Sequence, residues 1–186
     1  MSARERKPAA FLDRDGVINI DRGYVCRWED FAFVPGAVDA LRRLQAAGYA
    51  LIVVTNQSGI ARGYYDEAAL QGLHEALRGH LAGQGVMLDA IEYCPHLPGG
   101  SVPRYAIDCD CRKPAPGMIL RTAAALGIDL AASLMFGDKP SDIEAARRAG
   151  VGRAVLVATD ANPAAAKGEH PEFASLADAV DALIDA

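Results

Sequence analysis

Two carboxylates stand two residues apart near the start of the chain, where Asp13 and Asp15 follow the apolar run 9–12. In an extended segment, residues i and i+2 project to the same side. Such a pair can hold a divalent cation, or it can divide the work between a nucleophile and a general acid/base. A strand that ends in an ordinary polar turn would contain the same pair, and Gly16 permits a sharp turn in either case.

Two further segments offer groups that could hold a phosphate. Residues 55–59, Thr-Asn-Gln-Ser-Gly, set a hydroxyl and several hydrogen-bond donors after an apolar run. Oxyanion sites are built from such donors, although ordinary turns have the same composition. Arg112 and Lys113 form a basic pair, which on most surfaces is simply solvated. Here Pro114 and Pro116 stiffen the backbone, so the pair is presented on a rigid loop.

A second acidic segment, 137–142, reads Gly-Asp-Lys-Pro-Ser-Asp. Asp138 ends an apolar run, and carboxylates at such a position suit a hard, oxygen-preferring cation such as Mg²⁺. Asp142 is open to two interpretations, because a carboxylate in the first turn of a helix also complements the helix dipole. Lys139 could screen an anionic substrate beside this site, or it could point into solvent.

Three cysteines and a histidine form a compact set. Cys94 and His96 are separated by twelve residues from Cys109 and Cys111. Three sulfurs and one imidazole can satisfy a tetrahedral Zn²⁺ with no open position, so the metal would be structural and not catalytic. The alternative is a trio of reduced thiols beside a surface histidine. Because the last ligand directly precedes the basic pair, the metal would clamp the loop that presents it; the fourth cysteine, Cys26, is a lone thiol.

These residues must be positioned by a regular alternation of apolar strands and amphipathic helices. Strands are expected at 9–12, 50–54, 87–93, 133–136 and 154–157. Helices are expected at 36–47, at 67–81 capped by Asp66, at 116–126, at 142–150 capped by Ser141, and at 176–184, with a surface loop at 159–172. This order is typical of an α/β fold with a parallel sheet covered on both faces. Because parallel strands share one carboxyl edge, Asp13, Thr55 and Asp138 should meet there.

Composition limits the partners. The 186 residues, 51% of them hydrophobic and 23% charged, suit a single domain over 1–186. The net charge of −5 argues against a nucleic-acid partner, since a nucleic-acid backbone requires a cationic face. The longest apolar run, 49–54, is far below the ~18 residues of a membrane helix, and the N-terminus lacks a signal-peptide core. We therefore expect a soluble, cytoplasmic protein that does not bind membranes.

The joint order of these motifs is more specific than any one of them. Asp-x-Asp, then Thr, then Lys, then Gly-Asp-x-x-x-Asp, each near a strand end between residues 11 and 157, resembles the four motifs of the haloacid dehalogenase (HAD) superfamily of phosphohydrolases. The resemblance implies a Rossmann-like HAD fold. It also implies that Asp13 is the nucleophile, that Asp15 is the general acid/base, and that Thr55 and Lys113 stabilise the phosphoryl group. Asp13, the backbone carbonyl of Asp15 and Asp138 would bind Mg²⁺.

Three runs narrow the resemblance to one branch: Phe-Leu-Asp-Arg-Asp-Gly-Val-Ile-Asn at 11–19, Thr-Asn-Gln-Ser-Gly-Ile-Ala-Arg-Gly at 55–63 and Cys-Asp-Cys-Arg-Lys-Pro at 109–114. They are similar to the heptose 1,7-bisphosphate phosphatases, whose relatives include histidinol-phosphate phosphatases. The branch implies release of the 7-phosphate, in the synthesis of activated heptose for bacterial surface polysaccharide. The substrate-binding residues implied are Asp21, Arg22, Gly23, Tyr24, Thr55, Asn56, Gln57, Ser58, Arg112, Lys113 and Lys139.

The segments between the motifs are too short for the large cap domain of many HAD enzymes: only 19 residues separate Gly16 from Gly36. We therefore expect an open cleft, a small phosphorylated sugar as substrate and a monomer. Two alternatives stay open. One is histidinol phosphate or another small sugar phosphate as substrate. The other is a non-catalytic module that binds a phosphorylated ligand in the same cleft.

Overall fold

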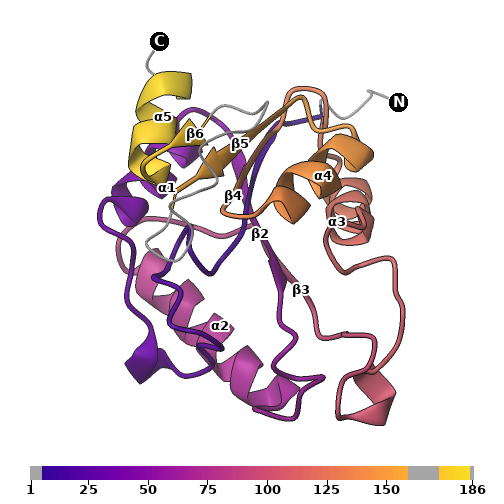
Figure 1. Cartoon of the computed structure of the whole chain (residues 1–186). Helices are drawn as coiled ribbons and strands as arrows, with labels where there is room; N and C mark the ends of the chain where they lie inside the picture. Colours follow the sequence, from indigo (N-terminus) through magenta and orange to yellow (C-terminus); the bar gives the residue numbers. More distant parts are fainter. Residues whose placement is uncertain (1–5, 159–171, 185–186) are drawn as a thin grey trace.

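The computed structural model describes residues 6–158 and 172–184, which fold into a layered α/β arrangement (Figure 1). Within these residues, the strands are β1 (Ala9–Leu12), β2 (Ala50–Asn56), β3 (Ala90–Cys94), β4 (Leu134–Gly137), β5 (Arg153–Val157) and β6 (Glu172–Phe173). The helices are α1 (Ala37–Ala46), α2 (Glu67–Ala82), α3 (Gly117–Leu126), α4 (Pro140–Ala149) and α5 (Leu176–Ile184), with short 3-10 helices η1 (Trp28–Asp30) and η2 (Pro103–Tyr105). All strand pairs are parallel, in the order β3-β2-β1-β4-β5-β6.

The central strand β1 shows how the sheet is covered. Ala10 and Leu12 pack into a core that includes residues of α1, α2 and α5. Ala9 and Phe11 point the other way, into a core that includes α3 and α4. All four side chains are completely buried, which is why this strand is apolar at every position and not at alternate ones. The predicted parallel sheet with helices on both faces is confirmed.

Several predicted boundaries differ from the observed ones, among them the end of β2, which runs to Asn56 instead of residue 54, and two of the differences have local reasons. The third strand begins at Ala90 instead of residue 87, because the Asp89 carboxylate accepts hydrogen bonds from the Leu51 N–H and from Lys7 and fixes the turn into the strand. Ser141 does not cap α4. That helix begins at Pro140, whose missing N–H costs nothing at a first helical position, and Asp142 accepts the N–H of Lys139 at 3.0 Å.

The sixth strand, β6, was not predicted. It pairs with β5 through Leu156 and Val157, although the composition of 159–172 predicts a loop that includes residue 172. A two-residue strand carries too little alternation to be recognised from sequence alone. The remainder of the predicted loop, 159–171, lies outside the described residues.

The carboxyl edge of the sheet gathers the candidate residues. β2, β1 and β4 are neighbours, so their carboxyl ends bring residues 55–57, 13–15 and 138 together. Between β1 and α1, and between β2 and α3, the described chain holds only α2, β3 and the two 3-10 helices, and no separate domain covers this edge. Among the described residues, no helix combines the length and apolar character needed to cross a membrane.

Candidate active site

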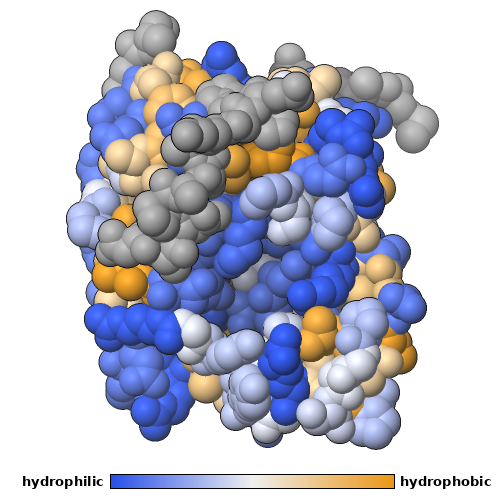
Figure 2. Space-filling model, viewed as in Figure 1, coloured by the Kyte–Doolittle hydropathy of each residue, from blue (hydrophilic) through white to orange (hydrophobic). Residues whose placement is uncertain are grey.

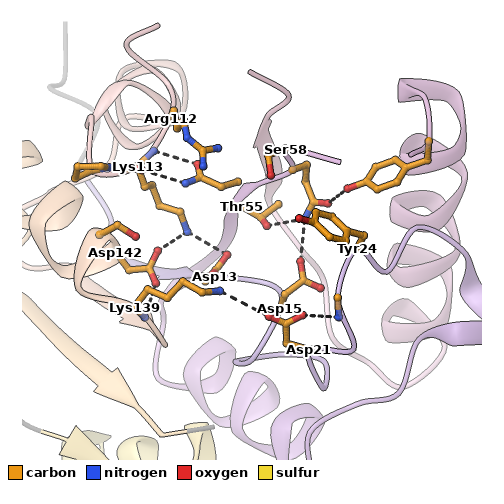
Figure 3. Close-up of a pocket in the computed structure, with 16 residues that line it drawn as sticks. Asp13, Asp15, Asp21, Tyr24, Thr55, Ser58, Arg112, Lys113, Lys139 and Asp142 are labelled. Carbon is orange, nitrogen blue, oxygen red and sulfur yellow. Dashed lines mark hydrogen bonds and ion pairs between the residues drawn. The ribbon is translucent and has the colours of Figure 1, made fainter. Parts of the chain in front are cut away.

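A cleft of about 630 Å³ opens at this edge of the sheet. Figure 2 shows a hollow bordered by hydrophilic residues near the middle of the face in view. The cleft is lined by the ends of β1 and β2, by the loop 112–114 and by the first turn of α4, with the segment 21–24 at one side (Figure 3). The topology therefore brings most of the candidate residues together, as predicted.

Lys113 is buried between two carboxylates at the base of the cleft. Its Nζ lies 3.0 Å from Asp13 Oδ1 and 2.6 Å from Asp142 Oδ1, and it donates to the Val54 carbonyl oxygen at 2.7 Å. Burial alone would lower the pKa of Lys113, but the charges of Asp13 and Asp142 outweigh it and raise the pKa above its usual value. The lysine is therefore a permanent cation directly beside Asp13.

Negative charge is concentrated next to that lysine. One carboxylate oxygen each from Asp13, Asp138 and Asp142 lies within 4.8 Å of the others, and all three residues are buried. Burial, followed by the charge of Asp13, raises the pKa of Asp138 to about 7. Gly137 lets Asp142 come this close, since a Cβ at Gly137 would lie 2.2 Å from that of Asp142. A crowded set of oxygen donors with excess negative charge fits a hard divalent cation.

The contacts of Asp142 decide between the two roles that the sequence left open for it, a place at the cation site or a partner of the helix dipole. Its two carboxylate oxygens meet the Lys113 ammonium and the Lys139 N–H. The residue therefore complements the start of α4 and also fixes the lysine at the cleft. Lys139 likewise lies at the site, with its Nζ 3.3 Å from Asp138 and 3.7 Å from Asp21.

Asp15 is held as a carboxylate by three donors. Arg14 Nη2 lies 3.0 and 2.9 Å from its two oxygens, Asn19 Nδ2 donates at 3.0 Å and Gln57 Nε2 at 2.9 Å. Burial would raise the pKa of Asp15, but the Arg14 charge and these hydrogen bonds lower it below the usual value. The carboxylate is thus ionised and held in one orientation.

The segment 55–59 orients its neighbours through its side chains. Gln57 Nε2 also donates to Thr55 Oγ1 at 2.9 Å, and Gln57 Oε1 accepts the Tyr65 hydroxyl at 2.6 Å. Asn56 pairs with both backbone groups of Lys113, at 3.0 and 3.1 Å. The ring of Tyr65 packs so closely on Gly59 that a Cβ there would lie 2.2 Å from it. This segment therefore positions the acid Asp15 on one side and the basic loop on the other.

The segment 21–24 contributes Asp21, Gly23 and Tyr24 to the cleft lining, but not Arg22, whose side chain is exposed. Asp21 accepts the Gly23 N–H at 2.9 Å. This turn, with positive φ at Gly23 and Tyr24, directs Tyr24 toward the cleft and Arg22 away from its lining. Ser58 and Arg112 also line the cleft, whereas Asp138 is buried and is not among the lining residues.

The predicted Cys/His set comes together beside the basic loop. The three sulfurs lie 3.2, 3.3 and 3.6 Å apart, and His96 Nδ1 lies 3.3 Å from Cys111 Sγ and 3.7 Å from Cys94 Sγ. Zn–S bonds of about 2.3 Å in a tetrahedral site would set the sulfurs about 3.8 Å apart. All four ligand atoms lie within 4.8 Å of one another, so the donor type and the compact geometry both suit zinc. Arg112 donates to the His96 carbonyl oxygen at 3.2 Å, which ties this cluster to the cleft.

Known proteins share both the sequence and the fold. The HAD-hydrolase-like family model matches residues 110–184. A D-glycero-beta-D-manno-heptose-1,7-bisphosphate 7-phosphatase from Yersinia pestis is 51% identical over 162 residues, covering 87% of this chain and 86% of that protein. The chain belongs to the HAD-like phosphatases. A protein of the same description from Escherichia coli K12 is 55% identical over 152 residues, covering 82% and 80%.

A solved structure agrees with this HAD-like assignment at the level of the fold. D,D-heptose 1,7-bisphosphate phosphatase from B. bronchiseptica, complexed with magnesium and phosphate, matches with a TM-score of 0.82 and 34% identity, covering 96% of this chain and 98% of that one. A HAD-like phosphatase of similar length thus binds the two ions that the buried carboxylates and Lys113 of the present chain would complement.

Two residues of the site were not singled out from the sequence. Arg14 is completely buried and holds Asp15, and Tyr65 lines the cleft and holds Gln57. The sequence does contain a signal for Arg14. An arginine between two acidic residues at the end of a buried strand must be paired with them or with other acceptors if it is itself buried. The sequence contains no such signal for Tyr65, because its approach to Gln57 depends on the conformation of the turn between them.

Proposed function

We propose that this chain removes the 7-phosphate of D-glycero-β-D-manno-heptose 1,7-bisphosphate and leaves the sugar 1-phosphate. The observation that carries the proposal is the identity of 51–55% with 7-phosphatases of that description, over more than four-fifths of the chain. The cleft adds chemical support, because Asp13 lies beside a buried, permanently charged Lys113. The name of these relatives also favours the β-anomer.

Asp13 is the proposed nucleophile. One of its carboxylate oxygens forms a bond to phosphorus while the bond from phosphorus to the C7 oxygen breaks. Asp15, which is ionised in the free site, would take up a proton before this step and give it to the leaving alkoxide. Lys113, 3.0 Å from Asp13, would offset the charge on the transferring oxygens, and Thr55 would donate to them. The products of this step are an aspartyl-phosphate and the sugar alcohol.

Hydrolysis of the aspartyl-phosphate completes the reaction. A water oxygen bonds to phosphorus, the bond from phosphorus to Asp13 breaks, and the Asp15 carboxylate takes the water proton. The donors around Asp15 stabilise this carboxylate form, which is the form that activates water. Inorganic phosphate leaves, and Asp13 returns to its starting state.

Mg²⁺ would be held by Asp13, Asp138 and the backbone carbonyl of Asp15, a set supported by the clustered carboxylates. When bound, the cation reduces the repulsion between an anionic nucleophile and an anionic phosphate. Asp142 would act indirectly, because its ion pair with Lys113 fixes the lysine beside Asp13.

Substrate recognition in our proposal uses the open cleft without a cap. Asp21, Gly23, Tyr24, Ser58 and Arg112 line it. The planar guanidinium of Arg112 suits the distal phosphate or sugar hydroxyls. Asn56, Gln57 and Lys139 would act at the same cleft, while Arg22 would contribute from outside its present lining. We further propose that residues 1–186 form one domain that works as a monomer.

The Cys/His set is proposed to bind one structural Zn²⁺ through Cys94, His96, Cys109 and Cys111. The support is a closed donor set of three sulfurs and one imidazole nitrogen within 4.8 Å. Its role would be to fix the loop that carries Arg112 and Lys113.

A substrate panel tests the proposed activity. We expect the purified protein with Mg²⁺ to release one phosphate per heptose bisphosphate, and the product to keep its C1 phosphate. The kcat/KM for the β-anomer should exceed that for the α-anomer. It should exceed the kcat/KM for histidinol phosphate by at least about 100-fold, because histidinol phosphate would leave unpaired the cleft groups that hydrogen-bond to the sugar. Phosphate release and product NMR measure both.

Two other results of this panel would replace the proposed activity with a different one. Faster turnover of histidinol phosphate would assign the chain to that activity. Tight binding of sugar phosphates with no turnover of any, in the presence of Mg²⁺, would make the chain a binding module.

A further inference from the structure

Arg14 is an unusual group to find in a protein core. Its side chain is 0% exposed, and its guanidinium is charged at all relevant pH values. Nη2 serves both oxygens of Asp15 and the Val25 carbonyl oxygen at 2.7 Å. Arg14 therefore joins the proposed acid/base to the base of the segment that carries Asp21 and Tyr24.

His74 makes the remaining strong contact of this guanidinium. It lies on α2, almost completely buried, with Nε2 3.2 Å from Arg14 Nη1. Arginine has no acceptor atom, so the hydrogen bond requires an unprotonated Nε2, which sets the histidine in its neutral form with the proton on Nδ1. Burial, followed by the Arg14 charge, lowers the pKa of His74 to about 3, in agreement with this assignment.

The contact matters because Arg14 has few ways to compensate for its loss. Among the described residues its Nε already has no hydrogen-bond partner. Without the His74 acceptor, Nη1 would also be left unsatisfied in a place closed to solvent, which is a costly state for a charged donor. The guanidinium would then rotate toward other acceptors and would no longer hold both oxygens of Asp15 in one orientation.

We propose that His74 is a positioning residue, which orients Asp15 by accepting a hydrogen bond from Arg14. The inference rests on the proposed phosphatase function and adds a residue from outside the cleft lining. It identifies α2, a helix that contributes none of the cleft-lining residues, as the support of the proton-transfer step.

The variants His74→Leu and His74→Gln separate this role from simple packing. Leucine fills the site but removes the acceptor, whereas the glutamine amide oxygen can accept from Arg14. If His74 only filled the core, leucine would be the milder change. His80→Gln is the matched control, because His80 is an exposed histidine on the same helix.

The readout compares two leaving groups. A sugar alkoxide needs a proton from Asp15, whereas dinitrophenolate leaves without one. We expect His74→Leu to lower kcat on the sugar bisphosphate about tenfold. The rate of the initial burst of dinitrophenolate from dinitrophenyl phosphate should change less than about twofold. His74→Gln should stay within about threefold of the wild type on both substrates, and His80→Gln should match it.

Three results would overturn the proposal: an unchanged kcat for His74→Leu, an equal loss on both substrates, or a loss in His74→Gln as large as in His74→Leu. Nitrogen-15 NMR of the wild-type histidines gives a test that needs no variant. His74 should be neutral, with the proton on Nδ1, throughout about pH 5 to 8, and a proton on Nε2 would contradict the inference. An inactive wild type with this tautomer would refute the proposed function alone.

Discussion

Replacing Asp13 with asparagine should lower kcat on the heptose bisphosphate by at least about 10⁴-fold, the scale of losing a covalent nucleophile. The amide keeps the size of the side chain but has no anionic oxygen to attack phosphorus. Lys113, 3.0 Å away, keeps its second carboxylate partner, Asp142, so the fold should persist. Rapid-quench phosphate release and thermal unfolding would measure the two effects separately.

The matched control for that experiment is Asp39→Asn. Asp39 lies on α1 and pairs with Arg42 at the surface, 2.8 Å away, so its loss should leave kcat within about twofold and stability within ~0.5 kcal/mol. If Asp13→Asn retained more than a tenth of the wild-type kcat, Asp13 would not be the nucleophile.

Replacing Cys111 with serine should remove the bound zinc and lower the free energy of unfolding by about 4 kcal/mol or more, because structural zinc binding contributes directly to folding. The Cys111 sulfur lies at 3.2–3.3 Å from Cys94 Sγ, Cys109 Sγ and His96 Nδ1, so its loss would leave three of the four donors of the closed set. Activity should fall as well, since Arg112 follows directly in the chain. Elemental analysis and denaturant unfolding would measure the two losses.

Cys26→Ser is the control, because Cys26 is a free thiol outside the cluster. The wild type and this variant should each hold about one equivalent of zinc, and should keep it through dialysis that removes Mg²⁺. A reduced, freshly purified wild type without zinc would contradict the structural-metal proposal, as would a Cys111→Ser variant of unchanged stability.

The residues at the carboxyl edge of the sheet were predictable because each is marked by its own neighbours in sequence. Asp13, Thr55 and Asp138 each fall at the end of an apolar run, and a parallel sheet has one carboxyl edge. Lys113 could be assigned only through the order of the motifs, since its burial depends on partners distant in sequence: Asp13, Asp142 and the Val54 carbonyl oxygen.

The support of Asp15 could not be predicted in the same way. His74 lies 60 positions from Arg14, and its helical spacing marks it only as a residue of the buried face of α2. Likewise, a serine near the start of α4 suggested a cap by residue type, whereas the structure uses Asp142, whose carboxylate also binds Lys113. In each case a long-range polar contact decides a role that local pattern leaves open.

The stereochemical course at phosphorus shows whether the phosphoryl group is carried for a time on Asp13. The substrate would be a 7-thiophosphate ester made chiral at phosphorus with two oxygen isotopes and hydrolysed in water enriched in the third, and the inorganic thiophosphate released would be analysed for its configuration. Two successive in-line displacements predict net retention. Net inversion would mean that water attacks the substrate directly and that no aspartyl-phosphate forms.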